Sequence, residues 1–204
     1  MSTRYFKNYN YDKTVVTAVE ADDTGTKYLW IAFSKNMAGN CLLWKVSANN
    51  PSQKFYEFTH AVEKIVAMKI LENYIFLALD DSINLGYFYA RTAPITTQNA
   101  IVIPSGVNEA PVDIAVDSIN SKVYFLTPGN ESGEVAKIIK CNNVGIYEET
   151  IELSESGTII NNAKSITVDS NGDIWVATYT DPVELVRIFE NSGGIYEFEV
   201  TEIV

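Results

Sequence analysis

Histidine, cysteine and basic residues are scarce in this sequence. One histidine and two cysteines among 204 residues leave little material for a Cys/His metal site or an acid–base pair. Lys and Arg number 15 against 26 Asp and Glu, and the net charge of −11 repels phosphate backbones. No apolar run approaches the ~18 residues of a membrane span, and the N-terminus shows no apolar signal segment. We expect no nucleic-acid or membrane partner, and a cytoplasmic or virion location.

The remaining composition is that of an ordinary globular protein, with 47% hydrophobic and 20% charged residues. A chain of this length buries roughly 70% of its unfolded surface, so it needs no disulfide or metal to fold. Cys41 and Cys141 fall at equivalent places in the first and third of the repeats described next. That placement separates them by more than a disulfide allows, and we expect two free thiols.

One sequence motif occurs four times along the chain. Each copy has a short apolar strand with a small residue at its centre, then a turn, then a strand that carries an aromatic residue. Intervals of 46, 48 and 51 residues separate the aromatics, which are Trp30, Phe76, Tyr124 and Trp175. A period of this size is typical of solenoids and propellers.

Each repeat contains four segments with period-two alternation that are rich in Val, Ile, Tyr, Phe and Thr, and no segment shows a convincing helical period. The sequence therefore predicts an all-β fold, a β-propeller of four four-stranded antiparallel blades. Small residues at positions 18, 67, 115 and 167 suit innermost strands that converge on an axis. The expected blades span approximately 15–60, 61–110, 111–163 and 164–204.

The phrases Ile166–Ala177 and Ile114–Phe125 carry a family resemblance. Their pattern, an apolar strand ending in Val-Asp, a turn, and an apolar strand with Trp or Tyr, resembles the repeats of NHL-like and SMP-30-like β-propellers. Such families usually have five to eight blades, and they include lectins, lyases, hydrolases and scaffolds. The resemblance implies a propeller that either closes as an unusually small four-bladed ring or forms half of an eight-bladed ring built from two chains.

Residues 1–14 lie outside the repeats and form an N-terminal aromatic arm. Three interpretations of the arm remain open: an outer strand that closes the ring, a hook onto a partner, or a loose tail. The arm places four aromatics among polar residues, namely Tyr5, Phe6, Tyr9 and Tyr11. These four are candidate binding residues.

Acidic residues recur in the loops between the second and third strands of the repeats. The candidates for binding are Asp80, Asp81, Glu131 and Asp181, and Glu134 shares the third of these loops. In a propeller these loops share one face of the disc. Carboxylates gathered there could contact a sugar, a cation or a basic partner, and the simpler interpretation is a solvated rim.

Two patterns hint at chemistry. The resemblance to lactonases and lyases draws attention to His60, but no second acid or base accompanies it. Asp169, Asn171 and Asp173 alternate like the start of a calcium loop, yet position twelve is Thr180, and a self-capped hairpin explains the pattern. We expect no catalytic residue, no bound metal and no cofactor.

The sequence therefore favours a non-catalytic interaction or scaffold module that displays loops on a rigid propeller. Its partner is expected to be a protein, and it could belong to a larger assembly such as a virus or phage particle. A carbohydrate-binding, lectin-like propeller is the first alternative, and an SMP-30-like hydrolase or lyase is the second. A homo-oligomer is compatible with all three.

Overall fold

The computed structural model describes residues 16–22, 27–34, 41–50, 54–60, 64–80, 83–91, 99–129, 134–155, 158–180 and 182–203, with the backbone alone at 54–60. The described residues form strands and turns and contain no helix. No described helix is therefore long and apolar enough to cross a membrane. The all-β prediction is confirmed.

The strands form four antiparallel sheets of four strands each, and every sheet follows chain order. We number these sheets blade 1 to blade 4. Blade 1 contains β1 (Val16–Asp22), β2 (Tyr28–Phe33), β3 (Cys41–Ser47) and β4 (Lys54–His60). Blade 2 contains β5 (Ile65–Leu71), β6 (Tyr74–Leu79), β7 (Asn84–Ala90) and β8 (Asn99–Val102). Blade 3 contains β9 (Asp113–Asp117), β10 (Lys122–Thr127), β11 (Lys137–Asn142) and β12 (Tyr147–Glu152). Blade 4 contains β15 (Ala163–Val168), β16 (Ile174–Thr178), β17 (Val183–Glu190) and β18 (Tyr196–Ile203).

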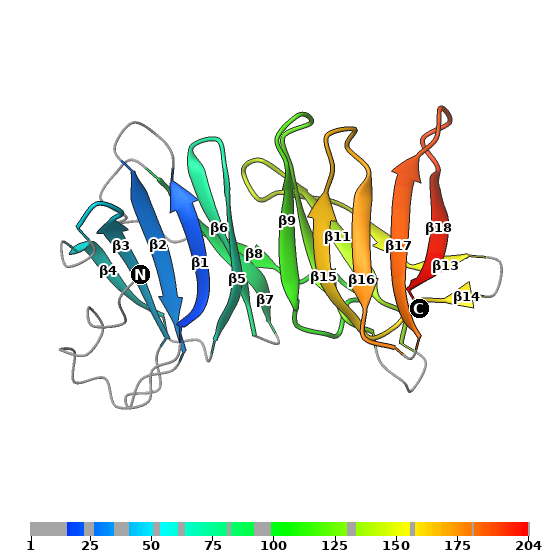
Figure 1. Ribbon diagram of the computed structural model, residues 1–204, viewed down its shortest axis with the longest axis horizontal. Coiled ribbons are helices and arrows are strands. Elements are labelled where there is room, and N and C mark those ends of the chain that lie inside the picture. The colour runs from blue at the N-terminus through cyan, green and yellow to red at the C-terminus, as the bar shows by residue number, and fades with distance from the viewer. Residues whose placement is uncertain are drawn as a thin grey trace.

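The first strands of the four blades stand next to one another. β1 contacts β5, β5 contacts β9, and β9 contacts β15, so the sheets succeed each other in chain order. Figure 1 shows the result: the blades follow one another along the long axis of the molecule, with blade 1 at one end and blade 4 at the other. Four-stranded antiparallel sheets that follow one another with their first strands adjacent are typical of propeller blades.

A small hairpin was not foreseen from the sequence. β13 (Ser154–Glu155) and β14 (Thr158–Ile159) pair within the connection from blade 3 to blade 4. The backbone N–H of Leu153 donates to Ala136, and that of Ala136 donates to Ile160, at 2.9 Å each. Two-residue strands carry too few residues for a period to be recognisable, which is why pattern analysis missed them.

The core lies between the blades. Three of the four clusters of buried apolar side chains join blade 1 to blade 2, blade 2 to blade 3 and blade 3 to blade 4. In blades 1, 2 and 3 the aromatic of the second strand sits in the cluster that leads to the following blade, with exposed fractions of 0% for Trp30, 0% for Phe76 and 5% for Tyr124. The repeated aromatic is therefore the side chain over which the next blade packs.

A fourth cluster lies on the other face of blade 1. It is made by Ile31, Phe33, Leu42, Trp44 and Val46, all of which are buried. The Phe33 and Trp44 rings stand 4.5 Å apart between centroids. Blade 1 consequently buries apolar side chains on both of its faces, as sheets stacked between other layers do.

Polar contacts also tie neighbouring blades together. Asp22, which is 1% exposed, lies 3.7 Å from the Lys45 Nζ and 3.6 Å from an Arg91 nitrogen, and Lys45 donates to the Arg91 carbonyl at 2.9 Å. Between blades 3 and 4, Asp113 accepts hydrogen bonds from the Ser165 hydroxyl and the Ile166 N–H at 2.8 and 3.0 Å. These bonds link neighbouring blades at defined positions, and the buried Asp22 carboxylate is tolerated because it is paired.

Truncation of a side chain between blades will test this packing. We expect Phe76→Ala to lower the free energy of unfolding by about 3 to 5 kcal/mol, since it opens a cavity between blades 2 and 3. Urea unfolding followed by fluorescence measures the change. The matched control is Ile119→Ala, at a side chain that is 66% exposed, with an expected change within about 0.5 kcal/mol. Equal effects of the two substitutions would contradict the assignment of the core.

Candidate functional site

The predicted binding residues fall mostly outside the described part of the chain. This applies to the four arm aromatics, Tyr5, Phe6, Tyr9 and Tyr11, and to the loop acids Asp81, Glu131 and Asp181. Asp80 is described and is exposed at the end of β6, and Glu134 is exposed ahead of β11. The structure thus describes one of the four predicted loop acids and leaves the arm as a prediction.

A hollow of about 210 Å³ opens beside Glu134, between the connection that leads into blade 3 and blade 3 itself. The Lys137 ammonium lies at its edge, where it donates to the Gly106 carbonyl at 2.7 Å and pairs with Glu152 at 3.4 Å. Glu109 accepts a hydrogen bond from the Gly129 N–H at 2.7 Å. The acids here hold loops in place while leaving polar groups at the surface.

A larger cleft of about 290 Å³ lies at the opposite ends of the strands, between blades 3 and 4. Its walls include two hairpins, β9–β10 and β15–β16. Asp117 shapes the first hairpin by accepting from the N–H groups of Ile119 and Asn120 at 2.8 and 3.0 Å. Asp169 shapes the second by accepting from the Asn171 and Asp173 N–H groups at 2.8 and 3.1 Å. Both are Asx-type caps.

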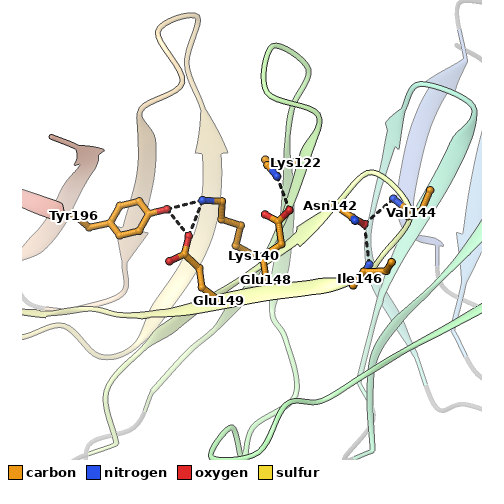
Figure 2. Close-up of polar contacts among 8 residues, drawn as sticks. All are labelled: Lys122, Lys140, Asn142, Val144, Ile146, Glu148, Glu149 and Tyr196. Carbon is orange, nitrogen blue, oxygen red and sulfur yellow. Dashed lines mark hydrogen bonds and ion pairs between the residues drawn. The ribbon is translucent and has the colours of Figure 1, made fainter. Parts of the chain in front are cut away.

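Beside this cleft, Lys140, Glu149 and Tyr196 form a closed triangle (Figure 2). Lys140 donates to Glu149 at 2.6 Å and to the Tyr196 hydroxyl at 2.9 Å, and the hydroxyl donates to Glu149 at 2.9 Å. Tyr196 comes from β18, whereas the other two come from β11 and β12. The triangle therefore joins blade 3 to blade 4 through charge-assisted hydrogen bonds.

The pKa values of the triangle follow from these bonds. Burial disfavours the charged form of Lys140, but the bonds to Glu149 and Tyr196 outweigh burial and raise the lysine pKa. Burial likewise disfavours the Glu149 carboxylate, and the bonds from Lys140 and Tyr196 reverse that effect and lower the pKa of Glu149. Burial raises the pKa of Tyr196. The ionised pair is therefore the stable form near neutral pH.

A second ion pair joins Lys122 and Glu148, beside the triangle (Figure 2). The turn between β11 and β12 is built by Asn142, whose side-chain oxygen accepts from the Val144 and Ile146 N–H groups at 3.1 and 2.9 Å. The β17–β18 turn repeats this geometry with Asn191. Two quasi-equivalent hairpins thus have the same chemical origin, an Asn that caps its own turn.

The residues that resemble the start of a calcium loop, Asp169, Asn171 and Asp173, form the β15–β16 turn. Asp169 accepts from the Trp175 indole N–H at 3.0 Å in addition to its two backbone bonds. These bonds, led by the one from Trp175, lower the pKa of Asp169. Asp173 binds Arg187 at 2.6 Å. The self-capping interpretation is confirmed, and no group of metal-binding side chains is found among the described residues.

His60 lies in a strand and not in a link between blades. β4 runs through residue 60, where His60 pairs with Cys41 of β3. Its side chain lies outside the description. Both thiols are free, as predicted, and both are buried. Burial raises the pKa of Cys41 to about 11 and that of Cys141 to about 12, which keeps both thiols protonated and unreactive.

Sequence reasoning missed a cation that accompanies the repeated aromatic. In blades 1, 3 and 4 the residue of the third strand paired with the aromatic is basic, giving Trp30 with Lys45, Tyr124 with Lys140, and Trp175 with Arg187. The Lys45 Nζ stands 5.0 Å from the Trp30 ring centroid, and the Arg187 Cζ stands 5.9 Å from that of Trp175. Blade 2 replaces the cation with Phe88, whose ring stacks at 5.5 Å on Phe76. Comparing the third strands of the four repeats would have revealed this pattern.

Comparison with known proteins supports the fold. Searches found no matching family model and no matching curated protein. Solved structures do match: a chain of Kuenenia stuttgartiensis hydrazine synthase, at 12% identity and a TM-score of 0.64, and a chain of a nidogen/laminin complex, at 12% identity and a TM-score of 0.62. Both contain propeller domains. At this identity the similarity establishes the fold alone.

The matches also show how the chain compares in length. The alignment covers 89% of this chain and 53% of the hydrazine synthase chain, and 91% of this chain and 64% of the chain from the nidogen/laminin complex. The chain therefore spans between half and two thirds of the proteins that it matches. The resemblance to NHL-like and SMP-30-like repeats is supported at the level of a propeller, and those particular families are not among the findings.

The pH dependence of stability will test the triangle. A lowered pKa at Glu149 stabilises the fold above the ordinary value of 4.5, and this stabilisation is lost as the pH falls through the lowered pKa. The raised pKa of Lys140 acts in the opposite sense: its contribution is complete below 10.5 and is lost as the pH rises through the raised value. We expect Glu149→Gln to reduce stability near pH 7 by no more than about 1 kcal/mol, because Glu149 stays partly exposed.

The measurement is urea unfolding of both proteins between pH 3 and pH 9. The difference should begin to shrink as the pH falls below the ordinary pKa of 4.5, because the contribution of the wild-type carboxylate is lost progressively from there toward its lowered pKa. Glu202→Gln, at an exposed position on the same outer strand β18 as Tyr196, is the control. Its difference from the wild type in free energy of unfolding should not vary with pH. A Glu149→Gln difference that does not vary with pH would contradict the triangle.

Proposed function

We propose that the chain is a non-catalytic interaction module of the propeller type. Its rigid blades hold loops and the N-terminal arm in position for a protein partner, as one component of a larger assembly. The observation that supports this most directly is the fold: four stacked sheets whose interiors are apolar and whose polar groups bond to one another. The side chains of the described clefts are committed to structure, with Lys140, Glu149 and Lys137 all held by neighbours.

Rigidity is what the module would contribute. Each blade contacts the next through an apolar cluster and through buried or half-buried hydrogen bonds, including those of Asp22 and Asp113. Loops fixed on such a frame lose little conformational entropy when they bind. The arrangement suits recognition by the loops at either end of the strands, where sequence variation leaves the blades intact.

The partner is proposed to be a protein contacted by the arm and by the acidic loops. Four aromatics within residues 1–14 supply the kind of side chain that dominates binding energy at protein interfaces. The loop acids Asp80, Asp81, Glu131 and Asp181 add negative charge, which favours a basic surface on the partner. A nidogen/laminin complex among the structural matches shows that one similar fold occurs in a protein complex.

Recovery of partners from native cells will test this proposal. We expect the tagged full-length chain to co-purify a protein partner, and a variant with Tyr5, Phe6, Tyr9 and Tyr11 all changed to Ala to recover at least about tenfold less, because aromatic anchors carry most of the energy of an interface. Quantitative mass spectrometry measures the recovery.

The matched control removes exposed tyrosines elsewhere. Tyr147 and Tyr179 are 46% and 76% exposed, and their double change to Ala should leave recovery unchanged. Neutralising the four loop acids should weaken recovery most at low salt, since charge attraction is screened by ions. Full recovery by the arm variant would refute the proposed role of the arm.

A further inference from the structure

The face of blade 4 that points away from blade 3 has the same residue pairing as the corresponding face of blade 1, which blade 2 covers. Trp175 pairs with Arg187 and Ala177 pairs with Leu185, just as Trp30 pairs with Lys45 and Ala32 with Leu43 in blade 1. In blade 1 this face is buried by blade 2. We call the corresponding surface of blade 4 the end face, defined by Trp175, Ala177, Leu185, Arg187, Phe189, Glu197 and Glu199.

The end face is less buried than its counterparts. Trp30, Phe76 and Tyr124 are 0–5% exposed beneath a following blade, whereas Trp175 is only half-buried. The Arg187 side chain is 34% exposed. Neither residue belongs to an apolar cluster in the part of the chain that the structure describes. A surface built like a blade-to-blade contact is thus left partly in solvent, which marks an interaction site.

At each covered face, the third-strand residue that pairs with the repeated aromatic is contacted by the following blade. The contacting residue lies in or next to the connection between the third and fourth strands of that blade. Lys45 meets the carbonyl of Arg91, and Lys140 meets the ring and hydroxyl of Tyr196. Phe88 meets Gly145, where an added Cβ would lie 2.8 Å from the ring. At the end face, Arg187 is held by Asp173 and Glu199 of its own blade. The occupant therefore needs aromatic or hydroxyl groups more than an added acid.

The charge of the end face selects among occupants. One cation, Arg187, stands among three acids, Asp173, Glu197 and Glu199, so the surface is net negative. Two copies meeting end face to end face would bring like charges together, which costs free energy. A basic, aromatic segment is the complementary occupant.

The N-terminal arm has that chemistry. Residues 1–14 contain Arg4, Lys7 and Lys13 against the single acid Asp12, in a chain whose net charge is −11. Along an extended strand, alternate residues share one face. Residues 5, 7, 9, 11 and 13 are Tyr, Lys, Tyr, Tyr and Lys, so one face of such a strand would present three tyrosines and two lysines. The contact of Tyr196 with Lys140 shows how a tyrosine covers the cation at this place in a blade.

The arm that reaches the end face is expected to come from another molecule. The arm precedes β1 in blade 1, and Figure 1 places blades 1 and 4 at opposite ends of the long axis. We propose that the end face of blade 4 binds residues 1–14 of a second copy of this chain, in a head-to-tail contact. This inference rests on the proposed function, because it takes the arm as a binding segment and specifies its receptor.

Chemical cross-linking of full-length chains will test the contact. The native thiols are buried, so an introduced cysteine is the reactive one. We expect a mixture of Tyr9→Cys chains and Phe189→Cys chains, treated with a short bismaleimide, to yield a species of twice 22.7 kDa on a denaturing gel. The control mixture pairs Tyr9→Cys with Ile119→Cys, which is 66% exposed on a blade 3 hairpin, and should yield at least about fivefold less, since proximity raises the effective concentration.

A yield no higher than that of the control would overturn the inference. So would a single chain bearing both Tyr9→Cys and Phe189→Cys that links only within itself at every concentration, because the arm would then bind its own blade 4. Either result leaves the proposed function standing if the arm-alanine variant still loses its partner. Retained partner recovery by that variant would instead refute the proposed function.

A charge exchange provides an independent measurement. Glu197→Lys should raise the dissociation constant of self-association about five- to tenfold at low salt, as measured by light scattering, because it reverses one charge of the end face. Lys7→Glu on the same chain should restore the wild-type value. A purely structural effect of Glu197→Lys would not be rescued by a change in the arm, and absence of rescue would count against the contact.

Discussion

The packing of each blade over the aromatic of the blade before it is the contact on which the rest of this structure depends. Trp30, Phe76 and Tyr124 each lie in an apolar cluster completed by the following sheet. A four-stranded sheet alone cannot bury both of its faces, so the stacking supplies most of the hydrophobic free energy. The polar contacts, such as the Asp22 cluster and the Lys140 triangle, add orientation to that packing, since paired buried charges define geometry more than they add stability.

In the part of the chain that the structure describes, most polar side chains near the clefts serve to hold the fold. Side chains that could act chemically are held by neighbours: Asp169 caps its own hairpin, Arg187 is bound between Asp173 and Glu199, and the thiols are buried. What remains free to vary are the loops at both ends of the strands and the half-buried end face of blade 4. This distribution of groups is compatible with the proposed interaction module.

The fold could be predicted from the sequence because the periodic aromatic and the small residue near it are visible along the chain, and both report on packing between successive sheets. The site was harder to predict. The triangle brings Tyr196 to Lys140 across 56 positions of sequence, and no local pattern signals such a contact. The cation paired with Trp175 went unnoticed because the third strands were not compared with each other. Two-residue strands such as β13 and β14 carry too little pattern to be recognised.

The succession of blades in chain order also bears on how the protein folds. Every strand of a blade pairs with the strand before or after it, and each blade touches its immediate neighbours. Cooperativity in such an array propagates by nearest-neighbour coupling, as it does along a one-dimensional lattice. These pairings close short loops. All four strands of an N-terminal blade are therefore available to pair while the later blades are still being synthesised. Blade 4, whose end face is half-buried, would then exchange its amide hydrogens sooner than the central pair.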